Sequence, residues 1–183
     1  MALIDDQNDR ERFIELYDHY KKAAIIIAMR LLNNRTLAED AVQEAFFRIA
    51  DNISKVEGIS PKTTSYINIV IRNVCFDILR KEKKNDTLPL DDNILSEKNI
   101  ELPDIQIILQ NSGIKFIAEC INSMDIIYRD AISLKYVYGY SVEEIAKSLG
   151  INEKTVEMRL YRGRKILKII LEENGYAVEQ QSE

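Results

Sequence analysis

Hydrophobic side chains in the first third of the chain recur at steps of three and four residues, the spacing of one helix face. The pattern predicts a helix that runs to about Leu32. A second helix is predicted to begin at a capping box formed by Thr36 and Glu39 and to end near Ile53. A third is predicted to begin at about Thr64 and to finish in a basic run.

Residues 85–104 break this periodicity, because Pro, Asn and Asp interrupt it and the segment is strongly acidic. Such a composition buries little apolar surface and is typical of a linker. We therefore expect an N-terminal domain over residues 1–84, a linker over 85–104, a C-terminal domain over 105–172 and a frayed tail over 173–183. The predicted fold class is all-α, with two small helical domains joined by a flexible acidic linker.

Helical spacing returns in the C-terminal part, where helices are predicted around residues 114–121 and 126–137. Ser141 and Glu144 form a second capping box, which begins a short helix. That helix stops at Gly150, and a longer one follows from Glu153.

The spacing of Ala146, Gly150 and Val156 is that of a helix-turn-helix, which needs a small residue at the crossing, a turn glycine and an apolar anchor. The charged residues of 154–168 are all basic except Glu157. Because phosphate and base-edge contacts need Arg and Lys, this helix is interpreted as DNA-binding. The alternative is a solvated charged helix, which would usually mix the two signs more evenly.

Two N-terminal helices carry further candidate surfaces. The segment 36–48 exposes acidic and amide side chains, which suit either a basic partner helix or simply solvent. In the segment 66–84, polar and charged residues recur at three- and four-residue steps beside an apolar face: Arg72, Asn73, Asp77, Arg80 and Lys81. Such a helix suits single-stranded nucleic acid, although a solvated helix end would have the same composition.

The composition limits the remaining function classes. The net charge of -5 argues against unaided coating of DNA, but the charge is segregated along the chain. The cysteines Cys75 and Cys120 and the single His19 make no metal-ligand cluster. We expect no cofactor and no enzymatic activity, because no nucleophile–base set or phosphate loop is present. The acidic start and short apolar runs predict a cytoplasmic protein without membrane insertion.

Three motifs together resemble one family. TLAEDAVQEAFFRI resembles the second conserved region of sigma-70 family proteins, and SYINIVIRNVCFDILRKEKK resembles that family's promoter-melting helix. The segment 123–167 resembles the fourth region of the family. The compact arrangement is similar to the extracytoplasmic-function (ECF) class of RNA polymerase sigma factors. The resemblance implies an alternative sigma factor whose partners are bacterial core RNA polymerase and promoter DNA, and it leaves open an anti-sigma factor.

The resemblance also implies roles for particular residues. Docking on core polymerase is implied for Asp40, Gln43 and Glu44. Binding of the −10 element as a single strand, by a loop at Pro61–Ser65 and the helix after it, is implied for Lys62, Thr63, Thr64, Ser65, Arg72, Asn73, Arg80 and Lys81. Binding of the −35 element as duplex is implied for Lys154, Thr155, Glu157, Met158, Arg159, Tyr161, Arg162, Arg164 and Lys165.

Four positions depart from the family pattern. Tyr66 stands where the family commonly has Trp, and Asp125 stands where Pro is frequent. Glu157 occupies a position that is often basic, and Gly163 replaces a frequent Ala, so these two bear on the promoter sequence. The competing class is a free-standing helix-turn-helix regulator that binds an operator as a dimer, which would leave segments 36–48 and 66–84 unexplained.

Overall fold

The computed structural model describes Ile4 and residues 6–85 and 112–176. Every regular element in these ranges is helical, which confirms the predicted all-α fold class. The elements are grouped in two compact units. The acidic linker predicted for residues 85–104 lies outside the described residues except for Asn85, and its flexibility stays a prediction.

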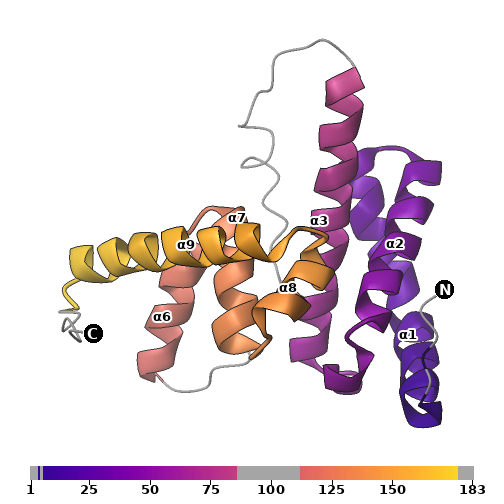
Figure 1. The fold of residues 1–183 in the computed structure, drawn as a ribbon, viewed down its shortest axis with the longest axis horizontal. Coiled ribbons are helices and arrows are strands. Elements are labelled where there is room, and N and C mark those ends of the chain that lie inside the picture. The colour runs from indigo at the N-terminus through magenta and orange to yellow at the C-terminus, as the bar shows by residue number, and fades with distance from the viewer. Residues whose placement is uncertain (1–3, 5, 86–111, 177–183) are drawn as a thin grey trace. The chain divides into compact units, whose positions relative to one another are not determined.

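The first unit is built by α1 (Gln7–Leu32), α2 (Arg35–Ala50), the short 3-10 helix η1 (Ile53–Lys55) and α3 (Pro61–Asn85). Helices α1, α2 and α3 contact one another pairwise and run side by side in Figure 1. Alanines at positions 24, 28, 41 and 45 are almost completely buried. Because helix separation depends on the side chains at the contact, these small residues let the helices approach closely.

Two consecutive asparagines separate α1 from α2: Asn33 closes α1 and Asn34 caps the start of α2. Asn33 takes a left-handed conformation with φ 50°, and its N–H donates to the carbonyl of Met29, which closes α1. The side chain of Asn34 accepts from the N–H of Leu37 at 3.1 Å and caps α2. The predicted end at Leu32 is therefore confirmed, but the predicted capping box is wrong. Glu39 instead pairs with Arg35 at 2.9 Å.

The third helix begins three residues earlier than predicted. Ser60 Oγ accepts from the N–H of Thr63 at 3.1 Å, and Pro61 fills the first helical position. The segment predicted as a DNA-binding loop at Pro61–Ser65 is therefore the first turn of α3. The preceding residues, from Asp51 to Ser60, connect α2 and α3 and contain η1.

The second unit contains α6 (Ser112–Asn122), α7 (Ile126–Ile132), the π-helical turn η2 (Ser133–Val137) and α9 (Glu153–Glu173). Helix α8 (Val142–Leu149) precedes α9, and its last residues, with Gly150, are grouped with the first unit. The helix predicted over residues 126–137 is thus two elements, because the N–H of Tyr138 donates to the carbonyl of Ser133 at 3.1 Å, five residues back.

The second capping box is confirmed. The N–H of Glu144 donates to Ser141 Oγ at 3.2 Å, and the N–H of Ser141 donates to Glu144 Oε2 at 2.8 Å. Helix α8 ends at Leu149, and Gly150 follows in the left-handed region with φ 65°. The order of helix, glycine turn and second helix agrees with the pattern predicted for a helix-turn-helix.

Gly163 belongs to the packing of α9 on α7, and its connection with the promoter sequence stays a prediction. The residue is buried, and a Cβ at this position would lie 2.9 Å from Ile132 Cγ1. Contacts below 3 Å force a neighbour to shift. The absence of a side chain therefore fits the close approach of α7 and α9.

Replacing Gly163 with valine is expected to lower the free energy of unfolding by about 1–3 kcal/mol, because the branched side chain overpacks the contact with Ile132. Arg164→Val is the matched control, since Arg164 is exposed on the same helix and should lose only about 0.5 kcal/mol of helix propensity. Urea unfolding followed by far-UV circular dichroism measures both. Equal losses for the two variants would contradict the packing role.

Candidate polymerase-binding and nucleic-acid-binding surfaces

The predicted polymerase-docking residues lie together on α2. Asp40, Gln43 and Glu44 are all exposed at positions i, i+3 and i+4, so they share one helical face. Phe47 lies on the same face at i+7 and is 42% exposed. Sequence reasoning missed Phe47, although its place between the buried Phe46 and the next turn signals an outward position. We call Asp40, Gln43, Glu44 and Phe47 the α2 strip.

An alternating chain of charges connects the α2 strip to α3. Glu44 Oε1 lies 2.9 Å from Arg48 Nε, and Arg48 Nη1 lies 3.5 Å from Asp77 Oδ2. Asp77 Oδ1 in turn lies 3.3 Å from Arg80 Nη1. This series of three ion pairs therefore begins at a predicted docking residue, Glu44, and ends at a predicted DNA-binding residue, Arg80.

The predicted −10 residues in the first turn of α3 have different environments. Thr63 is buried, and its Oγ1 donates to the carbonyl of Gly58 at 2.8 Å. The hydroxyl of Thr64 lies 2.9 Å from that of Tyr20, and Lys62 Nζ lies 3.6 Å from Glu57 Oε1. Ser65 is buried. These residues brace the segment before α3, and their direct contact with DNA stays a prediction.

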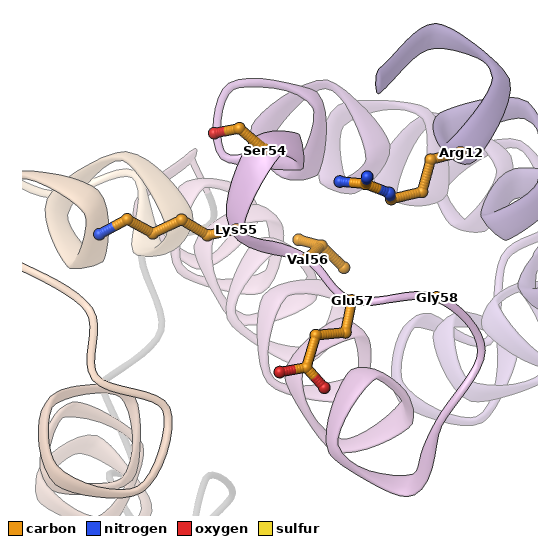
Figure 2. A pocket seen from close by; sticks show the side chains of 6 residues that line it. All are labelled: Arg12, Ser54, Lys55, Val56, Glu57 and Gly58. Carbon is orange, nitrogen blue, oxygen red and sulfur yellow. The ribbon is translucent and has the colours of Figure 1, made fainter. Parts of the chain in front are cut away.

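That segment lines an open hollow of about 390 Å³. Its residues are Arg12, Ser54, Lys55, Val56, Glu57 and Gly58. Figure 2 shows Arg12 extending from α1 towards the 54–58 segment, while the side chain of Lys55 points away from Arg12. Arg12 Nη1 is held by Asp9 at 3.1 Å. The volume falls in the range of small-ligand pockets, and the lining offers both signs of charge. The prediction from sequence did not include these residues.

The other −10 candidates lie further along α3. Arg72 is 1% exposed, so a contact with DNA would require it to leave its buried position. Asn73 is half-buried, and its amide donates to the carbonyl of Ile69 at 2.9 Å. Arg80 is half-buried, whereas Lys81 is exposed near the end of the helix. Arg80 and Lys81 are therefore the accessible members of this group.

Helix α9 presents most of the predicted −35 residues on its outer side. The exposed ones are Lys154, Glu157, Met158, Tyr161, Arg162, Arg164 and Lys165. Thr155 and Arg159 are half-buried at the edge of this side. Val156, Leu160 and Gly163 are buried, and their spacing of four and three residues places them together on the opposite face of the helix. We call the exposed set the α9 face.

Local contacts fix the start and the middle of the α9 face. Asn152 caps the helix, since its Oδ1 accepts from the N–H of Thr155 at 2.8 Å. Lys165 Nζ lies 4.6 Å from the centre of the Tyr161 ring. The hydrogen bond and positive charge of Lys165 lower the pKa of the Tyr161 hydroxyl. This pairing gives the ring a defined place on an otherwise cationic surface.

The remaining reactive side chains are structural in the part of the chain that is described. Cys75 and Cys120 are buried free thiols, and burial raises the pKa of Cys75 to about 12. A thiol with such a pKa is a weak nucleophile near neutral pH. Among the described helices, none is long and apolar enough to cross a membrane.

Two family models match this chain. The model of Sigma-70 region 2 matches residues 16–85, and that of Sigma-70, region 4 matches residues 117–167. The first region contains the α2 strip, the hollow and the −10 candidates, apart from Arg12 of the hollow. The second contains α8 and the α9 face. The two matches together span more than half of the chain.

Curated relatives agree with both matches. The ECF RNA polymerase sigma factor SigX of Bacillus subtilis is 28% identical over 163 residues, covering 86% of this chain and 82% of SigX. SigW of the same organism is 29% identical over 177 residues, covering 88% of this chain and 90% of SigW. SigL of Mycobacterium tuberculosis is 26% identical over 160 residues, covering 87% and 89% of the two chains.

One solved structure is also similar. The sigma factor RpoE of Bartonella quintana, in complex with the anti-sigma factor NepR, aligns with 87% of this chain and 96% of its own. The sequence identity is 20% and the TM-score is 0.36.

Two helical units with these surfaces and matches define a transcription initiation factor that works with RNA polymerase at promoters. The chain belongs to the sigma-70 family of RNA polymerase sigma factors, and within it to the extracytoplasmic-function group. It is an alternative sigma factor, and its partners are core RNA polymerase and promoter DNA.

Proposed function

We propose that this sigma factor divides its work among three surfaces. The α2 strip docks on core polymerase, the hollow with the end of α3 binds the −10 element as a single strand, and the α9 face reads the −35 element as duplex. The observation that carries the proposal is the placement of these exposed surfaces inside the two matched regions. Tethering on the polymerase then supplies a high effective concentration for each DNA contact, which suits an acidic protein.

For the α2 strip, composition and geometry support a docking role. Two carboxylates and an amide precede an exposed aromatic ring on one helical face, so the strip offers both polar and apolar contacts to a partner. The acidic side chains favour a basic partner surface. We therefore assign Phe47 to the docking surface together with Asp40, Gln43 and Glu44.

For the −10 element, the hollow supports capture of an unstacked base. Removing a base from the stack costs a few kcal/mol, which contacts in a pocket can offset. Arg12 and Glu57 offer hydrogen-bonding groups at the hollow, and Arg80 and Lys81 offer positive charge for the backbone. The buried Thr63, Ser65 and Arg72 are then supporting residues that hold this part of the unit in shape.

We further propose that the protein acts in the cytoplasm, without catalysis of its own, by placing the polymerase at a promoter. An anti-sigma factor is a candidate regulator of this activity. A free-standing operator-binding regulator is disfavoured, because it would give no role to the α2 strip.

The experiment that tests the proposed function mixes the purified protein with core polymerase and measures co-elution and promoter-specific run-off transcription. Co-elution together with specific transcripts is the expected result. DNA binding without polymerase, in the absence of co-elution, would instead identify a free-standing regulator.

The hollow gives a separate prediction. Gly58 lines the hollow, and an added Cβ there would meet nothing within 4 Å, so a large side chain should be tolerated and should hinder access to the hollow. We expect Gly58→Phe to reduce run-off transcription about tenfold, as blocked base capture would, with unchanged affinity for core polymerase. Gly58→Ala is the matched control and should remain active. Full activity of Gly58→Phe would exclude the hollow as a base-binding site.

A further inference from the structure

We propose that Arg48 and Asp77 are positioning residues that make polymerase docking and −10 binding depend on each other. This inference rests on the proposed function, since it joins the α2 strip to the DNA-binding end of α3. The chain from Glu44 through Arg48 and Asp77 to Arg80 provides the physical connection.

Exposure decreases towards the centre of this chain. The side chains of Glu44 and Arg80 are 51% and 39% exposed, so both can reach other molecules. The side chains of Arg48 and Asp77 are only 15% and 26% exposed. Ion pairs that are shielded from water interact more strongly, so the two central residues transmit a change at either end more effectively than a surface pair would.

The contact between Arg48 and Asp77 has room to tighten. Their closest atoms are 3.5 Å apart, whereas Arg48 and Glu44 are 2.9 Å apart. Arg48 Nη1 is buried and makes no hydrogen bond in the described ranges, although Asp77 Oδ2 lies 3.5 Å from it. If the Arg48 guanidinium loses its ion pair with Glu44, it can therefore gain a hydrogen bond and a shorter ion pair by moving towards Asp77.

The consequence is an ordered exchange of partners. When a cation of the polymerase takes Glu44, Arg48 closes on Asp77 and neutralises it. Asp77 then holds Arg80 less tightly, and Arg80 is released to a DNA phosphate. Because binding couplings are reciprocal, DNA bound at Arg80 strengthens polymerase docking by the same factor. In the free protein, Arg80 is restrained and its affinity for DNA is reduced.

Removal of the Glu44 charge should imitate docking. We measure the affinity of the free, full-length protein for a fluorescent single-stranded −10 oligonucleotide by anisotropy. Glu44→Gln is expected to raise this affinity about threefold, an effect of the size that partly exposed ion pairs produce. Glu39→Gln is the matched control, because it removes the same charge from α2 at a residue that pairs with Arg35 at 2.9 Å and not with Arg48.

Two further outcomes decide the inference. In an Arg80→Ala background, Glu44→Gln should no longer change the affinity, since the end of the chain is missing. An equal gain from Glu39→Gln, or a gain that survives Arg80→Ala, would mean that only general repulsion from DNA was removed and would overturn the proposal. Wild-type protein that fails to co-elute with core polymerase would instead overturn the proposed function.

Discussion

A variant in which Asp40 and Gln43 are replaced by alanine is expected to bind core polymerase more weakly, and adding Phe47→Ala is expected to bring the total loss to on the order of 100-fold. The reason is that the exposed ring of Phe47 supplies apolar area at one end of the α2 strip, while the polar residues before it suit a basic partner surface. Competition for labelled core polymerase measures the loss.

The matched control replaces Ile14 and Asp18 on α1, which are also exposed and spaced four residues apart. This control removes an apolar and an acidic side chain from a different face, so its affinity should stay within about twofold of the wild type. Circular dichroism checks that all variants keep their helicity. Wild-type affinity of the triple variant, with normal helicity, would remove the α2 strip from the docking surface.

Glu157→Arg is expected to change the preference for one base pair of the −35 element by about 1–3 kcal/mol. Glu157 is exposed on the α9 face among cations, where it cannot bind a phosphate but can accept a hydrogen bond from a cytosine amino group. Run-off transcription on promoter variants that differ at single positions measures the change. The alternative is that Glu157 lies just off the DNA and only repels its backbone.

A second variant separates these two explanations. Glu172→Arg makes the same charge change near the end of α9, far along the helix from Glu157. It should alter all promoter variants equally and only slightly. If Glu157→Arg likewise raises activity uniformly across promoter variants, then only repulsion was relieved, and the cytosine role is wrong.

Prediction of helix boundaries depended on how local the signal was. The capping box of Ser141 and Glu144 was predicted correctly, because both partners lie within one turn. At the start of α2, Asn34 and Thr36 were both possible N-caps. The structure uses Asn34, which directly follows the left-handed residue Asn33 that closes α1. The Ser60–Pro61 pair signalled the start of α3 but was interpreted as a loop.

The burial of individual candidate residues could not be predicted from the sequence. Arg72 is basic and follows the helical spacing of the DNA-binding candidates, yet it is 1% exposed. Gly163 resembled a substitution in the recognition helix, but the contact with Ile132 explains it. In both cases the prediction rested on residue type and position along the helix, whereas burial depends on packing against other elements.

The sequence by itself determined the helical periods, the helix-turn-helix order and the charge of the exposed faces, because these depend on residues within a few turns of one another. Only the tertiary structure decided which polar side chains are buried, where the hollow lies, and that Arg48 reaches Asp77. These last features join residues of different helices, far apart along the chain. Their contacts depend on how closely α1, α2 and α3 pack, and no local pattern specifies that distance.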